Sequence, residues 1–281
     1  MNASPEKVQP APRSTQQTNA VFEHLTRHRT WPNVPTSVIL GIALGLVGII
    51  VIVVDWRLRD STTYSTAFSE AAGLAGNIPF LIVIISPFIA AALTAVMTSR
   101  FASGEALAML KLTNVSPRAI IQGLLLAALF RLRLLWAISF GVLIPLVPAG
   151  AFTLIEIRQS GVQSLTVTRP DEPSPFWLGI EILLIVASIA IALNWFAICT
   201  AISMALRRRN PAEALAVSLV AVLGSLIVLI LCVGIEAYAS VYSLAYTNPD
   251  TYLLVRVLIV LLVFVYPFGG IALLRLAQSR L

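Results

Sequence analysis

The fold is decided by residues 36–54, which read TSVILGIALGLVGIIVIVV. This stretch contains no charged residue. A helix of about 20 apolar residues matches the roughly 30 Å hydrocarbon core of a bilayer. The stretch therefore predicts a transmembrane helix.

Five further apolar runs have a similar length, at residues 77–98, 134–152, 178–203, 214–236 and 253–274. They do not alternate polar and apolar residues, as strands of a membrane barrel would. The whole chain is 58% hydrophobic and 11% charged, whereas a soluble domain carries about 25% charged residues. These features predict an all-α integral membrane protein with about six transmembrane helices.

The basic residues predict the orientation of the chain. With the N-terminus in the cytoplasm, 14 of the 19 Lys and Arg residues fall on the inner side and five on the outer side. Cytoplasmic segments carry the excess of basic residues in membrane proteins. We therefore expect a multi-pass protein of the cell membrane, plasma or inner, with both termini cytoplasmic. The net charge of +6 then reflects topology, and no nucleic acid partner is expected.

The chain divides into three parts in this interpretation. Residues 1–18 are polar and rich in Pro, Gln and Ser, which predicts a disordered cytoplasmic tail. Residues 19–35 are expected to form an amphipathic elbow segment on the membrane surface. Residues 36–281 form the six-span transmembrane domain.

The longest predicted cytoplasmic connection, residues 99–133, separates spans two and three. Residues 104–113 predict a short amphipathic helix, followed by a turn at 114–115. Ser116 then suits the N-cap and Pro117 the first position of a second helix, which is expected to run on through Arg131 and Arg133 into span three. The short helix either transmits motion from a cytoplasmic partner or rests passively at the interface.

The same segment resembles the cytoplasmic motif of type-2 ABC transporter permeases. Residues 103–125 read SGEALAMLKLTNVSPRAIIQGLL, and residues 19–27, NAVFEHLTR, resemble the start of the family before span one. The sequence departs from the family pattern at Asn114, Leu124 and the Gly-Glu order at 104–105. The matching positions are Leu107, Leu110, Leu112, Thr113, Ser116, Ile120 and Gly123.

This resemblance implies a permease subunit of an ATP-driven transporter, most often an exporter. It implies two partners besides lipid: an ABC ATPase subunit, and a second permease subunit, identical or related. ATP would be bound by the partner, with no cofactor in this chain. The residues expected to contact the ATPase are Gly104, Glu105, Leu107, Leu110, Thr113, Asn114 and Ser116.

Motifs for chemistry within the chain are absent from the sequence. No Gly-x-x-x-x-Gly-Lys-Ser/Thr loop occurs, so no ATPase activity is expected and the chain is not expected to be an enzyme. His24 and His28 have the spacing of metal ligands on a helix, but His-Glu-x-x-His is absent. A solvated or headgroup-facing elbow helix is the favoured interpretation of these two residues.

A few features inside the spans are candidates for a pathway or for helix packing. Asn194 lies near the middle of span four, and Glu181 and Glu236 lie near the outer ends of spans four and five. Buried amides commonly link helices, while ionisable groups in membranes are candidates for function. The Gly41-x-x-x-Gly45 pattern allows close helix approach. Pro145 and Pro148 are expected to kink span three.

Two other classes of function stay open at this level. A secondary transporter or channel would carry charged relays deep in the spans or paired broken helices. A non-transporting membrane anchor or assembly subunit needs neither. Co-purification of a nucleotide-binding chain separates the permease hypothesis from both.

Overall fold

A computed structural model describes the backbone of most of the chain. The described residues are 20–26, 33–58, 66–104, 107–108, 112, 115–159, 175–208, 210–246 and 249–279. Within them, side chains are not described at 20, 66–76, 153–159, 175, 177–178, 181, 232–246, 249–259 and 262. The predicted tail, residues 1–18, lies outside the described residues.

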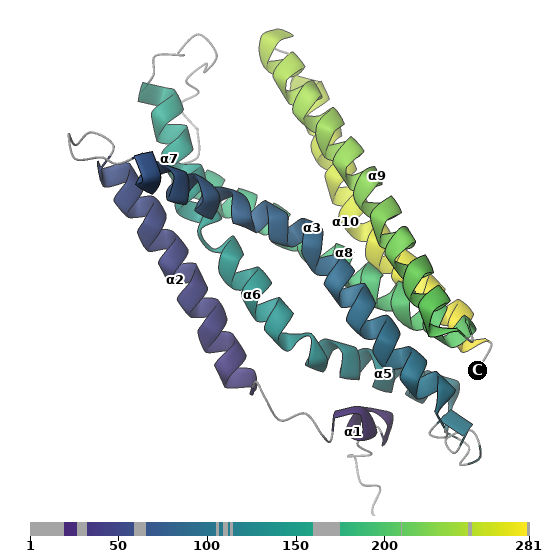
Figure 1. Ribbon diagram of the computed structural model, residues 1–281. Helices are drawn as coiled ribbons and strands as arrows, with labels where there is room; N and C mark the ends of the chain where they lie inside the picture. Colours follow the sequence, from purple (N-terminus) through teal and green to yellow (C-terminus); the bar gives the residue numbers. More distant parts are fainter. Residues whose placement is uncertain are drawn as a thin grey trace, which may run out of the picture.

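Every regular element in the described residues is an α-helix, which confirms the predicted all-α class. The label α4 is not used in Figure 1. The helices are α1 (Ala20–Thr26), α2 (Val34–Leu58), α3 (Thr66–Ser103), α5 (Pro117–Arg131), α6 (Arg133–Leu143), α7 (Leu146–Gln159), α8 (Pro175–Arg207), α9 (Pro211–Tyr246) and α10 (Pro249–Gln278).

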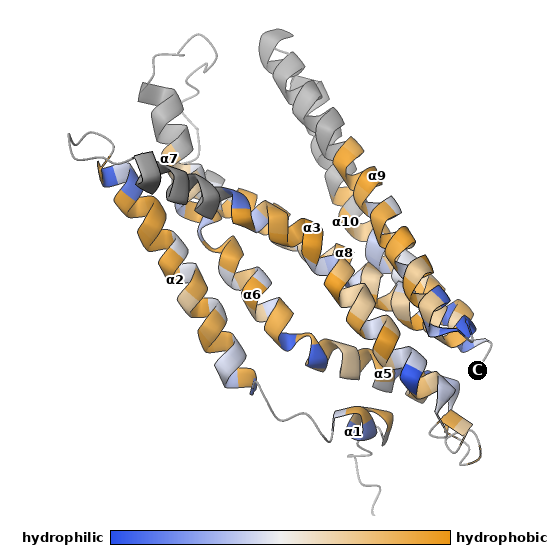
Figure 2. Ribbon diagram, in the orientation of Figure 1, coloured by the Kyte–Doolittle hydropathy of each residue, from blue (hydrophilic) through white to orange (hydrophobic). Residues whose placement is uncertain are grey.

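Five stretches are long and apolar enough to cross a membrane, judged on the described residues. They are Val34–Leu58, Asn77–Ser103, Arg133–Phe152, Ile182–Arg207 and Pro211–Leu231. The shorter apolar stretch Val263–Gln278 lies in α10. The helices continue beyond the apolar runs read from the sequence, because backbone hydrogen bonding can continue past the hydrocarbon boundary. Figure 2 shows hydrophobic residues along these helices and hydrophilic ones toward their ends.

Lipid is the natural environment of the outer faces. On α2, Ile39 is 66% exposed and Val47 is 59% exposed. Exposed apolar surface on this scale is rare on a soluble monomer. Both the exposed apolar side chains and the length of the apolar helices therefore indicate a multi-pass membrane protein.

The helices pack around α8, which contacts α3, α7, α9 and α10. On the other side of α3, α6 lies between α3 and α2 (Figure 1). Tyr266 of α10 donates a hydrogen bond from its hydroxyl to the Ser225 carbonyl of α9, at 2.7 Å. The second half of α10 is thereby fixed to the bundle.

The pattern Gly41-x-x-x-Gly45 forms the contact between α2 and α6. A Cβ atom on Gly41 would lie 2.5 Å from the carbonyl oxygen of Ala137, and one on Gly141 would collide with the backbone of Gly41. Both glycines are buried. The two backbones approach so closely that only hydrogen fits between them.

Span three breaks at Pro145, as its prolines predict. Helix α6 ends at Leu143 and α7 begins at Leu146. Proline has no N–H, so Pro145 and Pro148 leave the carbonyls four residues earlier without their usual donors. The preceding residues supply donors instead: Ile144 N–H bonds Gly141 O at 3.3 Å, and Val147 N–H bonds Ile144 O at 3.2 Å.

A second break corrects the prediction of one helix running from Pro117 into span three. Helix α5 ends at Arg131, Leu132 is a turn, and α6 begins at Arg133. Figure 1 shows α5 lying across one end of the bundle and α6 rising from it. We call this end, where α1, α5, the last turn of α3 and the α8–α9 turn lie, the basic end.

Candidate functional site

The connection between α3 and α5 lies at the basic end. Helix α3 ends at Ser103, whose hydroxyl donates to the Arg100 carbonyl at 3.4 Å. Gly104 is a bend and not part of a helix, which corrects the predicted helix start. Because the Ser103 hydroxyl bonds back to Arg100, Ser103 belongs to the end of α3 and does not cap a following helix. Leu107, Ala108 and Leu112 are helical.

The leucines of this segment differ in their surroundings. Leu107 is half-buried and packs against the hydrophobic core of the chain itself. Leu112 is 81% exposed. Of the two described leucines of this segment, Leu107 is occupied within the bundle and Leu112 is available to a partner. Of the predicted contact residues, Glu105, Leu110, Thr113 and Asn114 lie outside the described residues.

Ser116 caps α5, as its sequence position predicts. Its hydroxyl accepts a hydrogen bond from the Ala119 N–H at 3.2 Å, and its backbone is extended, with φ −63° and ψ 142°. Pro117 follows in the first turn, where its missing N–H costs nothing. The cap fixes where the connection ends and α5 begins.

Helix α5 carries the connection into the bundle. Its buried face consists of small and aliphatic residues that pack toward α1, α3, α8 and α10. Two family-matching positions, Ile120 and Gly123, belong to this face. The buried residues are Ile120, Ile121, Gly123, Leu124, Ala127 and Ala128.

Helix α1, within the predicted elbow, packs against α5. Val21 is buried, and the rings of Phe22 and Phe130 meet edge to face with centroids 5.8 Å apart. Arg131 donates from Nη2 to the Leu25 carbonyl at 2.6 Å. Glu23 is exposed, which gives α1 a polar outer side. Helices α1 and α5 therefore form one packed unit.

The two histidines of the elbow are not brought together as a described site. His24 is exposed and His28 lies outside the described residues. Across the described residues, no three His, Cys, Asp or Glu side chains gather to hold a metal ion.

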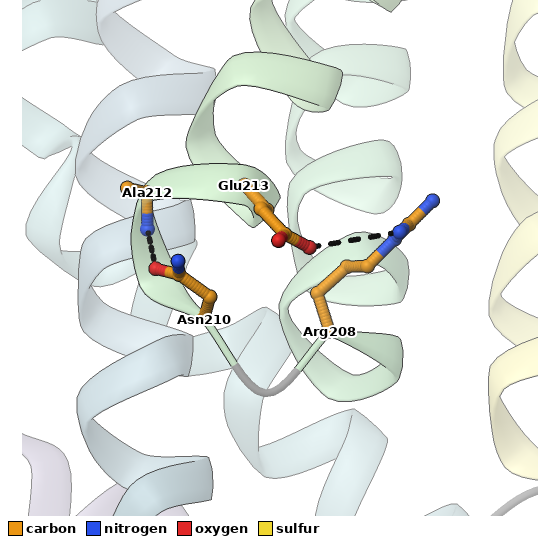
Figure 3. A network of polar contacts seen from close by, with 4 residues as sticks. All are labelled: Arg208, Asn210, Ala212 and Glu213. Atoms are coloured by element: carbon orange, nitrogen blue, oxygen red, sulfur yellow. Dashed lines mark hydrogen bonds and ion pairs between the residues drawn. The ribbon is translucent and has the colours of Figure 1, made fainter.

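The α8–α9 turn is fixed by its own polar contacts (Figure 3). Asn210 accepts a hydrogen bond from the Ala212 N–H through Oδ1 at 3.0 Å, so it caps the start of α9. Arg208 Nη1 lies 3.6 Å from Glu213 Oε2, and both side chains are more than half exposed. Such exposed pairs contribute at most about 1 kcal/mol, so the cap sets the turn more than the ion pair does.

Asn194 lies in the seam between α8 and α3. It is 2% exposed, and its Nδ2 donates to Ser86 Oγ at 2.9 Å and to the Ala190 carbonyl at 2.8 Å. The bond to Ser86 links α8 to α3, and the bond to Ala190 lies within α8. The side chains of Glu181 on α8 and Glu236 on α9 lie outside the described part of the chain.

Buried hydroxyls also occur on α3 and α8, a feature that sequence reasoning missed. Five hydroxyls on these two helices are buried and have no hydrogen-bond partner in the structure. Helices α3 and α8 pack against each other along much of their length. These hydroxyls belong to Thr94, Thr98, Ser99, Thr200 and Ser203.

Comparison with protein-family models, curated proteins and solved structures gave no match to this chain.

Proposed function

We propose that this chain is the membrane-spanning permease subunit of an ATP-driven transporter of the type-2 ABC class, for export. A separate ATPase chain binds and hydrolyses ATP, and a second permease subunit completes the pathway. The proposal starts from the resemblance carried by residues 19–27 and 103–125.

One observation carries the proposal furthest: the side chain of Leu112 is 81% exposed between two fixed points. Leu107 packs on the core before it, and Ser116 caps α5 after it. An apolar side chain held outward on a short, anchored segment suits insertion into a groove of a partner. A helix of about ten residues is marginal in water, so packing against a partner would also stabilise it.

The contacts of α5 supply a route for motion in this mechanism. A push on the segment moves the end of α3 and the start of α5 together. Helix α5 contacts α1 and α8, and α8 packs along α3. Closure of the ATPase is thereby passed to the seam between α3 and α8.

The charge distribution disfavours a secondary transporter that works through ion relays. No Asp, Glu, Lys or Arg occurs within residues 34–54, 77–99, 134–152, 182–206 or 214–231. The buried acidic residue of the described spans, Asp55, lies in the last turn of α2, away from the middle of the span. Proton- and ion-coupled carriers commonly place ionisable residues at such depths. ATP hydrolysis by a partner requires no such relay in this chain.

The proposal is tested by purifying the full chain from its native membrane in mild detergent. We expect an ATP-hydrolysing chain to co-purify in a defined ratio. We also expect the isolated chain to show no ATPase activity, because it has no phosphate-binding loop. Purification of an intact, folded chain without any ATP-hydrolysing partner would favour the membrane-anchor or channel alternatives.

A further inference from the structure

Three grooves of the bundle meet at the break between α5 and α6. A groove between α3 and α6 has a volume of about 460 Å³, and one between α2 and α6 about 450 Å³. A third, between α3 and α5, has a volume of about 310 Å³. Arg133 lines the first two grooves, and Arg131 lines the first and third.

The two grooves that flank α6 have apolar walls. Leu93 of α3 and Ile138 of α6 line one, while Ile42 of α2 and Phe140 of α6 line the other. Leu93 and Ile42 are each 52% exposed. Each groove therefore offers a hydrocarbon chain a lengthwise contact with α6.

The arginines at the head of these grooves are held in place. Arg131 is bonded to the Leu25 carbonyl, as described above. The Arg133 guanidinium lies 4.1 Å from the centre of the Phe130 ring, in a cation–π contact. Arg100, in the last turn of α3, lines the α3–α5 groove with Arg131. Leu132 thus lies between arginines in two of the grooves: Arg100 and Arg131 line one with it, and Arg131 and Arg133 line the other.

The parts of α3, α5 and α6 that line these grooves contain no acidic residue. Residues 77–103, 117–131 and 133–143 contain no Asp or Glu. Arg100, Arg118, Arg131 and Arg133 are the charged residues of these ranges. The local charge therefore suits an anion, and guanidinium groups suit phosphate in particular.

The site lies at the ends of two apolar spans, where the phosphate groups of a bilayer are expected. Arg133 begins the stretch Arg133–Phe152 that is apolar enough to span, and Arg100 lies near the end of Asn77–Ser103. Figure 2 shows the hydrophilic junction of α5 and α6 directly beside the hydrophobic α6. Basic pockets at the cytoplasmic ends of spans bind anionic headgroups.

We propose that an anionic phospholipid binds astride the first turn of α6. Its phosphate lies on Arg133 and Arg131, one acyl chain follows the α3–α6 groove, and the other follows the α2–α6 groove. Because Arg131 also holds α1, the bound lipid would tie the elbow to the junction. This proposal does not depend on the transport function, since no ATPase or second subunit takes part.

The test uses the purified full chain in bilayer nanodiscs that contain phosphatidylglycerol or phosphatidylcholine with identical acyl chains. Native mass spectrometry after release counts the lipids retained. We expect selective retention of phosphatidylglycerol. Arg133→Gln should weaken that selectivity about fivefold, since one basic residue near a membrane surface is worth about that factor. Arg133→Lys should keep most of it.

Two controls make the result decisive. Arg275→Gln removes an exposed arginine of α10, which lines none of the three grooves, and should leave retention unchanged. In wild-type protein, dibromo-phosphatidylglycerol should quench the fluorescence component that Trp136→Phe removes, because Trp136 lines the α2–α6 groove. Dibromo-phosphatidylcholine at the same mole fraction should quench it less. Equal retention or equal quenching by the two lipids, or an equal effect of Arg275→Gln, would overturn the proposal.

Discussion

Arg131 of α5 and Leu25 of α1 are joined by a hydrogen bond of 2.6 Å between Nη2 and the carbonyl oxygen, across 106 positions of sequence. The last carbonyls of a helix have no hydrogen-bond donor within the helix. A cation placed there also interacts favourably with the negative end of the helix dipole. Arg131 therefore fixes a short helix that could not persist alone. The link joins the elbow to the helix that follows the proposed ATPase-contact segment.

Arg131→Gln should release α1 from α5. A hydrogen bond to a charged group is worth about 1.5–3 kcal/mol, which corresponds to about tenfold or more in the open population. A cysteine at Val21, which is 1% exposed in the folded chain, reports opening by its labelling rate in a background without Cys199 and Cys232. Arg118→Gln changes an exposed arginine of α5 and should leave the rate unchanged. Equal rates in all three proteins would show that the bond does not hold α1.

Gly41→Ala should destabilise the contact between α2 and α6. The added Cβ meets the Ala137 carbonyl oxygen at 2.5 Å, and backbone cannot move aside cheaply. Overpacking of this kind costs about 1–3 kcal/mol, so the thermal midpoint in detergent should fall. Gly224→Ala is the matched control, because a Cβ there meets nothing within 4 Å. A midpoint lowered equally by both substitutions would contradict the proposed close approach.

Asn194→Ala and Ser86→Ala should be coupled in a double-mutant cycle. Hydrogen bonds between membrane helices contribute about 0.6 kcal/mol on average and up to about 1.7. Thr200→Val removes a buried hydroxyl that has no partner, so it should be neutral or stabilising. Unfolding in mixed micelles measures all of these variants. A coupling energy of zero would show that the Asn194–Ser86 bond does not contribute to the α3–α8 seam.

The predicted orientation is tested by cysteine labelling of intact cells in a cysteine-free background. Ser103 and Asn210 are exposed at the basic end, and Arg57 is exposed near the opposite end of α2. An impermeant reagent should label a cysteine at position 57 in intact cells. It should label positions 103 and 210 only after permeabilisation. The reverse pattern would place the basic end outside and overturn the orientation.

Features governed by local chemistry could be read from the sequence. Ser116 and Pro117 specify a helix start through their own backbone and hydroxyl, and Pro145 breaks span three because it lacks an N–H. The Gly41–Gly45 pattern indicated a close helix contact. It could not name Gly141 as the partner, since that pairing depends on how α6 is placed.

Features governed by tertiary contact could not be read in the same way. The break at Leu132 has no proline or glycine beside it, and it accompanies the attachment of Arg131 to α1. Leu107 is half-buried and Leu112 is exposed because the ends of α3 and α5 fix how the segment between them is oriented. The spacing of the leucines in the sequence would equally allow Leu107 to be exposed and Leu112 to be buried.

The central claim is that the segment between α3 and α5 docks an ATPase, and Leu112→Ser tests it most directly. A buried leucine side chain is worth about 1.5–3 kcal/mol, or about tenfold or more in affinity. Leu276→Ser is the matched control, because Leu276 is 55% exposed on the last part of α10, outside the segment. The measurement is the yield of ATP-hydrolysing partner recovered with each tagged variant at equal membrane expression. The account predicts that Leu112→Ser lowers this yield at least tenfold while Leu276→Ser retains it, and equal recovery with both variants would contradict docking at this segment.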